Sequence, residues 1–407
     1  MKRAKNSGFI ILVMMMSFAL LLAGCGDGAD SGPGPGDFPV GGTGTLKDDW
    51  YNNLDDTFTI NNADELAGLA RIVNDGEDDF YGKTIILSVN LELSAYSGGE
   101  GWIPIGNSTH EFWGTFDGDY KTISGLVINT TDANVGLFGK VGDDATIKNL
   151  GVIGADIKGG TFVGSIVGYA GNCAFSNCYA TGEVRGDGFI GGLIGNLLAG
   201  EVSGSFSTCK VSSVGNYAGG LVGFDNTSSS INNCYATGAV DGILYVGGLT
   251  GGGDSGRVTM CYATGEVSAN RHAGGLAGYF QGGKIEFSVA LNLAINRTGG
   301  SYNDFGRVVG FVSSGTVLNP NGNLALDGMD LPSGVSTTAG EFTRNGADFP
   351  KNLITDQSQY SEGFSEGFGW SFNAGSGQWK MGNAAYPLPV LYWQTEASYP
   401  VLPEHLK

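Results

Sequence analysis

Between residues 135 and 310 the chain repeats a short phrase in which apolar residues are set among glycines. The closing glycines of seven such phrases follow one another at steps of 29, 27, 28, 28, 27 and 32 residues. A fixed period in this range is typical of a solenoid, in which each repeat forms one coil and stacks on its neighbours. The phrases close at Gly139, Gly168, Gly195, Gly223, Gly251, Gly278 and Gly310.

Four repeats carry a second phrase in which small residues alternate with larger or polar ones. A period of two is that of a β-strand, whose successive side chains point to opposite faces. We expect the small apolar set to point into the coil and the other set to point outward. Equivalent side chains of stacked coils would then form ladders with one rung about every 4.8 Å. The inward ladder would contain Val184, Val211, Val240 and Val267.

Aromatic side chains recur at two positions of the repeat. The first ladder is expected to be exposed, so that a sugar or an aromatic side chain of a partner could stack on its rings. The alternative is that the rings stack on one another and stiffen the coil. The facing of the second ladder stays open, because a Gly-Gly pair can bend the strand beside it. The first ladder is Tyr179, Phe206, Tyr235 and Tyr262; the second is Phe162, Phe189, Tyr217 and Tyr245.

One helix is predicted ahead of the repeats, over residues 61–74. Asn62 can cap its N-terminus, with Glu65 three residues later as in a capping box. Leu66, Leu69 and Val73 lie on one face at helical spacing. We expect this helix to cover the open end of the sheet stack, because an uncovered strand edge invites aggregation.

The N-terminus has the pattern of a lipoprotein export signal. Basic residues precede an uncharged apolar run over 9–22, which has the length of a signal peptide core. Leu22-Ala23-Gly24-Cys25 follows and resembles the lipobox of bacterial lipoproteins, which implies lipidation of Cys25 and attachment to a membrane. Residues 26–45 are rich in glycine and proline and are predicted to be a flexible tether.

Composition narrows the classes of partner. The formal net charge is -19, which disfavours nucleic acid because binding of its phosphates depends on clustered lysine and arginine. Glycine accounts for 72 of 407 residues without a collagen period, as suits short strands joined by tight turns.

The repeated phrase resembles a known family. Ala218-Gly-Gly-Leu-Val-Gly223 and the later Cys234-Tyr-Ala-Thr-Gly238 resemble the GLUG repeat of bacterial surface proteins, which also accompanies IgA-specific metallopeptidases. Segments 63–70, 102–106 and 114–118 resemble the lead-in usual before such repeats. The resemblance implies an all-β fold, a right-handed parallel β-helix of roughly 28-residue coils, at a bacterial surface. The zinc motif His-Glu-x-x-His of the peptidase is missing.

The cysteines could be paired by oxidation or could be small wall residues of the coil. Besides Cys25 there are five, namely Cys173, Cys178, Cys209, Cys234 and Cys261. The second interpretation is favoured, because Ser205 fills the same slot in one repeat. A zinc site is not expected, since no Cys-x-x-Cys or histidine pair accompanies them.

No catalytic constellation stands out. Gly253-Asp-Ser-Gly256 resembles a serine protease motif but consists of turn-forming residues, and the chain has only three histidines. Acidic residues that could act in pairs gather in the lead-in and are expected to be solvated loop residues. They are Asp48, Asp49, Asp55, Asp56, Asp75, Glu77, Asp78 and Asp79. No metal, cofactor or catalytic residue is therefore predicted.

The sequence predicts a non-enzymatic, lipid-anchored protein of the bacterial cell envelope, at the outer membrane or cell surface, that binds a glycan or a protein. The alternative is a polysaccharide lyase or glycoside hydrolase on a β-helix, which fold analogy alone supports. The predicted segments are 1–25 (signal peptide and lipobox), 26–45 (tether), 46–134 (lead-in with the capping helix and first irregular coils), 135–326 (repeats) and 327–407 (C-terminal cap).

Overall fold

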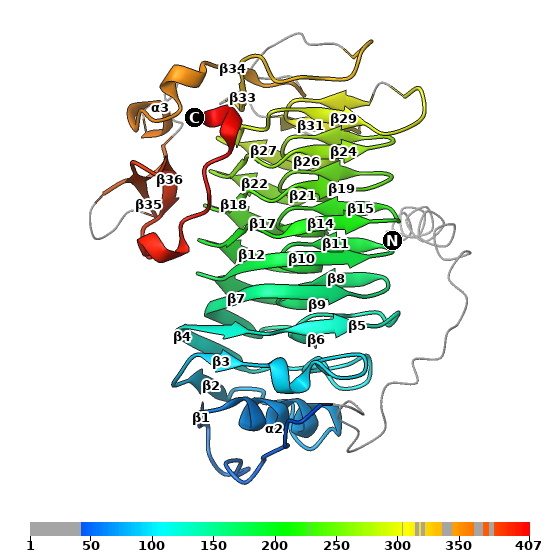
Figure 1. Ribbon diagram of the computed structural model, residues 1–407, viewed down its shortest axis with the longest axis vertical. Coiled ribbons are helices and arrows are strands. Elements are labelled where there is room, and N and C mark those ends of the chain that lie inside the picture. Colours follow the sequence, from blue (N-terminus) through cyan, green and yellow to red (C-terminus); the bar gives the residue numbers. More distant parts are fainter. Residues whose placement is uncertain are drawn as a thin grey trace, which may run out of the picture. The chain divides into compact units, whose positions relative to one another are not determined.

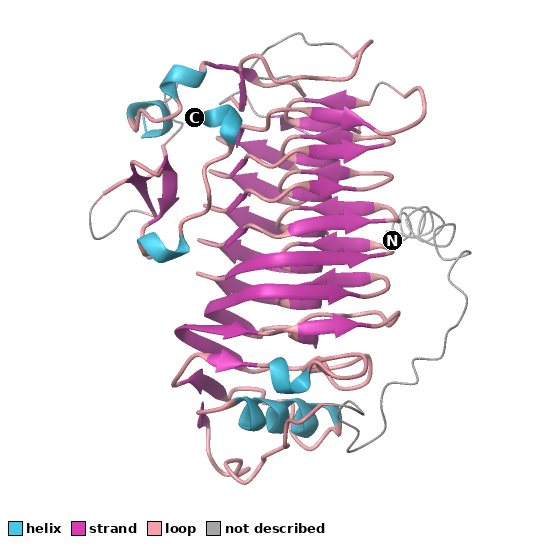
Figure 2. Cartoon of the chain, in the orientation of Figure 1, coloured by secondary structure: helices cyan, strands magenta, loops and turns pink. Residues whose placement is uncertain are grey.

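The computed structural model describes residues 42–226, 228–302, 304–313, 317–318, 322–335, 344–361, 369–373 and 378–407. The predicted signal peptide, Cys25 and most of the tether lie outside these residues. In the described part, parallel strands stack into a β-solenoid of about nine turns, which confirms the predicted all-β solenoid (Figure 1). Figure 2 shows that strands make up almost all of the stack and that helices are short.

The repeats have one strand layout. In the coil that starts at Phe162, β8 (Phe162–Gly164) leads through a tight turn into β9 (Val167–Ser176), and β10 (Tyr179–Gly186) closes the coil. Each strand pairs in parallel with its equivalent one repeat later; Phe189, for example, lies between Phe162 and Tyr217. These steps of 27 and 28 residues confirm the predicted coil length.

The remaining strands follow this order. The first coils contain β1 (Thr57–Ile60), β2 (Thr84–Leu87), β3 (Leu91–Glu92), β4 (Thr115–Ser124), β5 (Val127–Asn129), β6 (Phe138–Val141) and β7 (Thr146–Lys158). The next coils contain β11 (Phe189–Gly191), β12 (Ile194–Ser203), β13 (Phe206–Ser207), β14 (Lys210–Ser213), β15 (Tyr217–Gly219), β16 (Val222–Asp225), β17 (Ser229–Asn232), β18 (Tyr235–Ala236) and β19 (Val240–Asp241). They are followed by β20 (Val246–Gly247), β21 (Thr250–Asp254), β22 (Arg257–Thr259), β23 (Tyr262–Ala263), β24 (Val267–Ala269), β25 (Ala273–Gly274), β26 (Ala277–Gln281), β27 (Lys284–Glu286), β28 (Val289–Ala290) and β29 (Ile295–Arg297). The last coils contain β30 (Phe305–Gly306), β31 (Val309–Val312), β32 (Val317–Leu318), β33 (Leu324–Leu326) and β34 (Ala347–Phe349), and β35 (Trp379–Asn383) and β36 (Tyr386–Leu391) form an antiparallel hairpin.

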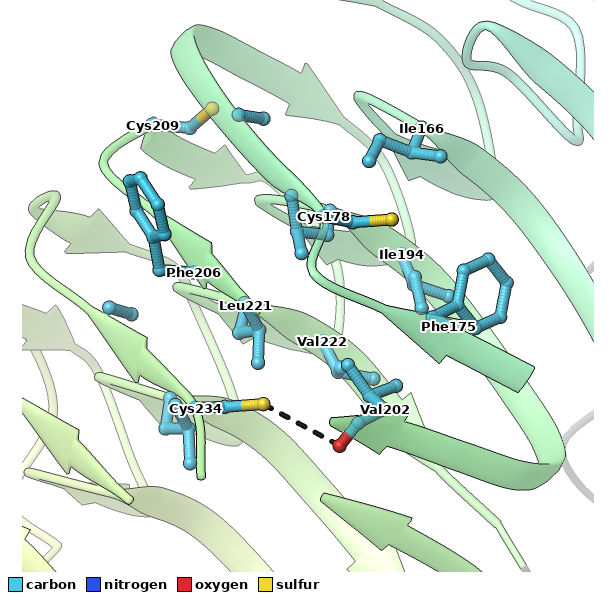
Figure 3. Packing of buried hydrophobic residues seen from close by; sticks show 14 of the residues in the cluster. Ile166, Phe175, Cys178, Ile194, Val202, Phe206, Cys209, Leu221, Val222 and Cys234 are labelled. Atoms are coloured by element: carbon cyan, nitrogen blue, oxygen red, sulfur yellow. Dashed lines mark hydrogen bonds between the residues drawn. The ribbon is translucent and has the colours of Figure 1, made fainter. Parts of the chain in front are cut away.

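The interior of the coils is apolar, as the alternation predicts. Val184, Val211, Val240 and Val267 lie in register one above another and are fully buried. Figure 3 shows Cys178 and Cys234 among Ile194, Val202 and Val222 in this core.

The glycines of the repeated phrase allow backbones to approach closely. A Cβ on Gly219 would lie 2.0 Å from the carbonyl oxygen of Val222, and one on Gly223 would lie 2.4 Å from that of Gly195. Neither residue has a positive φ. Close approach rather than a left-handed backbone therefore requires glycine here, and the turn brings the strands before and after it together.

The predicted capping helix is confirmed as α2 (Ala63–Asn74). The Asn62 side chain accepts a hydrogen bond from the Glu65 amide at 3.0 Å, and the Glu65 carboxylate accepts one from the Asn61 amide at 2.7 Å. Leu66 and Leu69 on its apolar face are fully buried, and α2 lies at the N-terminal end of the stack (Figure 1). The other helices are η1 (Ser94–Tyr96), η2 (Lys351–Leu353), α3 (Ser358–Ser361), η3 (Glu396–Ser398) and η4 (Glu404–Leu406). No helix of the described residues is long and apolar enough to cross a membrane.

The five cysteines of the described part are free and buried, as the wall-residue interpretation predicts. Burial raises the pKa of Cys178 and of Cys209 to about 12. Because the thiolate is the reactive form, these thiols should be inert in the folded protein.

We therefore expect the folded chain from Gly26 to Lys407 to react with a thiol reagent only after denaturant is added. Reaction is followed by the release of the chromophore of Ellman's reagent. The variant Ala174→Cys is the matched control, because Ala174 is exposed and lies next to buried Cys173. Reaction of the unmodified chain as fast as that of the variant would contradict the burial of the cysteines.

Candidate functional site

The first ladder is a continuous stack of rings. Tyr179, Phe206, Tyr235 and Tyr262 lie in register, and successive ring centroids are 4.9, 4.8 and 4.8 Å apart at interplanar angles of 11°, 4° and 5°. The rings therefore stack on one another, as the alternative interpretation predicts.

The expectation that the first ladder is exposed is wrong. Phe206 is 1% exposed and Tyr235 and Tyr262 are fully buried; only Tyr179 reaches solvent. The C-terminal segment, by which we mean residues 369–373 and 378–407, covers these rings. In Figure 1 its hairpin β35–β36 lies beside β18.

Hydrogen bonds fasten the C-terminal segment to the ladder. Tyr262 donates to the carbonyl oxygen of Pro389 at 2.8 Å, and Gln394 donates through Nε2 to the Tyr235 hydroxyl at 2.8 Å. The indole Nε1 of Trp379 donates to Asn233 Oδ1 at 2.9 Å. Part of the predicted cap 327–407 therefore lies along the side of the coils, while β34 pairs with β33 and extends the stack.

This cover gives the tyrosines an apolar environment. Burial raises the pKa of Tyr235 and of Tyr262 well above the ordinary value for a phenol. The first ladder, predicted as a ligand site, is therefore an internal interface in this structure.

The second ladder remains partly exposed. Centroid distances from Phe162 to Phe189, to Tyr217 and to Tyr245 are 5.1, 5.0 and 4.7 Å in turn. His272 continues the stack at 5.0 Å from Tyr245, at an interplanar angle of 12°. The strands that carry the second ladder, among them β8, β11 and β15, lie on the side of the stack opposite β35–β36 (Figure 1).

A further row of rings that we did not predict as a site runs beside the second ladder. This flanking row contains Tyr169, Phe224, Tyr279 and Phe311, which are all partly exposed. Tyr169 lies 5.3 Å from Phe162, and Phe224 lies 4.7 Å from Tyr217. The tight glycine turn between the two strands brings the ladder and the row together.

The second ladder and the flanking row form what we call the aromatic strip. The sequence signal for the flanking row was an aromatic residue directly after the closing glycine of the phrase, as in Gly168-Tyr169, Gly223-Phe224 and Gly278-Tyr279. The strip comprises Phe162, Tyr169, Phe189, Tyr217, Phe224, Tyr245, His272, Tyr279 and Phe311.

Charged groups at the edges of the strip are largely paired. Lys140 lies 5.3 Å from the ring centre of Tyr169, and its amine is 2.7 Å from Glu111. Arg271 is 3.3 Å from Asp304, and its guanidinium carbon lies 4.4 Å from the ring centre of Tyr302. Arg271 stands next to His272 at one end of the strip.

His272 is an uncharged member of the strip at neutral pH. It is 3% exposed, and burial together with the charge of Arg271 lowers its pKa to about 4. The strip therefore offers neutral aromatic surface along its length.

The candidate catalytic groups have structural roles. Ser255 has a φ of 64° and its hydroxyl donates to the adjacent Asp254 at 3.2 Å, so the predicted turn is confirmed. In the lead-in, Arg71 pairs with Asp48, Asp75 and Glu77 at 2.7, 3.2 and 2.6 Å. No group of three or more potential metal ligands is found among the described residues.

Asp225 is a buried carboxylic acid that the sequence did not reveal. It is fully buried beside Thr250, whose hydroxyl donates to it at 3.0 Å, and Ser229, whose hydroxyl donates at 3.2 Å. Burial raises its pKa to about 7, although both hydrogen bonds act in the opposite direction. The register places it where neighbouring coils have Leu197 and Gly253.

Comparison with known proteins supports the repeat and the fold. Halomucin of Haloquadratum walsbyi is 32% identical over 204 aligned residues, which cover 42% of this chain and 2% of Halomucin. A Gly-rich membrane protein of Evansella cellulosilytica is 41% identical over 68 residues, which cover 16% of this chain and 8% of that protein. The chain thus matches only a small part of either relative.

The crystal structure of a protein described as an immunoglobulin A1 protease from Bacteroides ovatus has a similar fold. The TM-score is 0.53 at 19% identity, over 88% of this chain and 97% of that one. An identity this low bears on the fold alone.

Residues 159–185 match the family model "The GLUG motif". The matched span begins just before β8 and ends one residue before the end of β10, so that one motif corresponds to one coil. Residues 159–185 thus carry a GLUG motif, and this motif forms one coil of the parallel β-solenoid.

Proposed function

We propose that this protein is a non-enzymatic module of the bacterial cell surface, held to a membrane by lipid on Cys25, that binds an extracellular glycan or protein through the aromatic strip. The observation that carries the proposal is the contrast between the two ladders. The first ladder is covered by the chain itself, whereas the strip stays partly exposed over several coils. Contiguous exposed apolar surface commonly marks a site of interaction.

Two further features support a surface location. The N-terminal segment has the order of a lipoprotein signal, ending at Cys25. One relative is described as a membrane protein. A lipid anchor followed by a glycine- and proline-rich tether would present the solenoid away from the bilayer.

An enzymatic role has less support. The cations at the edges of the strip, Lys140 and Arg271, are paired with Glu111 and Asp304. The carboxylates Asp143 and Asp254 act on different rings, Tyr169 and Tyr217. A glycoside hydrolase needs two carboxyl groups that flank one glycosidic bond.

The test is binding of the soluble chain from Gly26 to Lys407 to a glycan array and to extracellular proteins. We expect a specific ligand whose binding is lost in the double variant Phe189→Ser, Tyr245→Ser. The matched control is Tyr81→Ser, which removes a tyrosine that is 64% exposed and lies outside the strip. Binding that survives in the double variant would contradict the role of the strip. The release of reducing or unsaturated sugar ends would contradict the non-enzymatic part.

A further inference from the structure

The aromatic residues of the flanking row are spaced differently along the coils from those of the second ladder. In register along the stack, Tyr169 is followed by Asn196, Phe224, Gly252 and Tyr279. From Tyr169 to Tyr279 aromatic rings therefore occupy every second coil, with a small or polar residue between them. Phe311 follows Tyr279 directly in the next coil, with its ring centroid 5.9 Å away. Successive coils are about 4.8 Å apart, so the rings recur about every 9.6 Å.

The flanking rings present their faces differently from those of the second ladder. In the ladder Phe189, Tyr217 and Tyr245 are each stacked between two rings, which cover their faces and leave mainly their edges exposed. In the flanking row, Asn196 and Gly252 separate the rings, so that no ring of the same row lies in the next coil between Tyr169 and Tyr279. Phe224 is also inclined by 60° to Tyr217, and Tyr279 by 51° to Tyr245.

This spacing suits one class of ligand. In an extended β-1,4-linked glycan, alternate sugars turn the same face to one side, and the disaccharide repeat is close to two coil spacings. The apolar C–H face of a sugar packs on an aromatic ring. Rings that recur at a fixed spacing along a repeat protein can contact sugars that recur at the same spacing. Glycans that curve, such as α-1,4- or β-1,3-linked chains, would leave this register within a few sugars.

Asn196 supplies a polar contact between the first two rings. It is 6% exposed and shares the register of Tyr169 and Phe224. Its side-chain amide can donate a hydrogen bond to a sugar hydroxyl or accept one from it. At Gly252, between Phe224 and Tyr279, an added Cβ would lie 2.9 Å from the Tyr217 ring. Glycine therefore leaves this position without a protruding side chain.

The charge around the strip favours a neutral ligand. Burial raises the pKa of Tyr169 and of Tyr217, and the charges of Asp143 and Asp254 add to these shifts, whereas the charge of Lys140 lowers the pKa of Tyr169. The formal net charge of the chain is -19. An anionic polysaccharide would be repelled by this surface, whereas an uncharged one would not.

We infer that the flanking row binds a neutral, extended β-1,4-linked glycan that runs along the solenoid axis. Alternate sugars lie on Tyr169, Phe224 and Tyr279, and the intervening sugars lie over Asn196 and Gly252. The inference rests on the proposed function, and it specifies the ligand class and the direction of the chain. Five sugars span the row from Tyr169 to Tyr279.

The first test uses the unmodified soluble chain and cello-oligosaccharides of two to six sugars in isothermal titration calorimetry. Chito-oligosaccharides are titrated in parallel, since they share the linkage. We expect affinity to rise with length until five sugars are reached and then to level off. Maltohexaose and laminarihexaose, which curve, should bind at least tenfold more weakly. This series needs no variant and so does not depend on the folding of one.

The second test removes the central ring. Phe224→Ala should weaken binding of the five-sugar glycan about tenfold, the effect of one lost aromatic contact of about 1.4 kcal/mol. Asn196→Leu should weaken it several-fold. Tyr392→Ala, at a position that is 43% exposed in the C-terminal segment, is the matched control and should bind as the unmodified chain does.

The outcomes separate this inference from the proposed function. Strip-dependent binding of a protein or of a curved glycan, without binding of the β-1,4-linked series, overturns the inference and leaves the proposed function standing. Binding of the series that is unchanged by Phe224→Ala and by the variants of the second ladder overturns both. Affinity that does not change with length from two to six sugars overturns the alignment along the axis.

Discussion

Replacement of Asp225 with asparagine is expected to stabilise the protein at pH 8 and to leave its stability at pH 4 nearly unchanged. The carboxyl group is fully buried, and its pKa is raised from the usual 3.8 to about 7 by desolvation. Below pH 4 the group is protonated in both the folded and the unfolded protein. Between pH 4 and 7 it ionises in the unfolded protein but stays protonated in the folded one, so stability falls as pH rises.

The size of this effect follows from the shift. Each unit of pKa difference corresponds to about 1.4 kcal/mol, so the full loss is on the order of 4 kcal/mol above pH 7. The asparagine side chain introduced by Asp225→Asn is neutral at every pH and keeps a polar group facing Thr250 and Ser229. Urea unfolding between pH 4 and 8 should therefore show a growing advantage of the variant over the unmodified protein.

Asp241→Asn is the matched control, because it removes the same charge from an exposed position of the same coil. Its free energy of unfolding relative to the unmodified protein should not follow the same curve. If Asp225→Asn differs from the unmodified protein by a constant amount at all pH values, the carboxyl group is not held neutral in the folded state.

Truncation of Trp379 to alanine is expected to lower the free energy of unfolding by about 3 to 5 kcal/mol, the usual cost of removing a large buried aromatic side chain. The indole is fully buried. Its ring centroid lies 4.6 Å from that of Trp370 and 6.0 Å from that of Tyr262. It also provides the hydrogen bond to Asn233 that joins the C-terminal segment to the coils.

The loss of stability in Trp379→Ala should affect the C-terminal segment before it affects the stack of coils. Coils of a solenoid depend mainly on their neighbours, so the C-terminal segment can detach while the stack persists. Limited proteolysis of Trp379→Ala should therefore cleave the C-terminal segment early and leave the repeats intact. Tyr392→Ala, in the same segment but exposed, should behave as the unmodified protein does. Unchanged thermal unfolding and proteolysis of Trp379→Ala would contradict the role of this segment as a cover.

The repeat explains why so much of the fold could be predicted. Each coil contacts chiefly the coils one repeat before and after, so a local pattern repeated at a fixed period is enough to set the register. The buried valine ladder, the stacking of the aromatic rings and the N-capped helix α2 all follow from residues that are close in sequence or one repeat apart.

The candidate site could be predicted less well from the sequence, because the alternation of inward and outward residues breaks at the closing glycine of the phrase. Val222 and Asp225 both point inward, although they are three residues apart, and Phe224 between them points outward. The break falls at Gly223, where a Cβ would lie 2.4 Å from the carbonyl oxygen of Gly195. A strict period of two therefore could not place Phe224 in the flanking row or Asp225 in the core.

The sequence by itself determined the solenoid, its coil length, the inward and outward sides of the second phrase, and which residues lie in register. Only the tertiary structure decided which outward surface is free. The first ladder is covered by residues more than a hundred positions later in the chain, through contacts such as Tyr235 to Gln394 and Tyr262 to Tyr386. Alternation reports on which side of a strand a residue lies and carries no information about what a distant, non-repeating segment packs against. That packing left the aromatic strip, rather than the first ladder, as the surface able to meet a ligand.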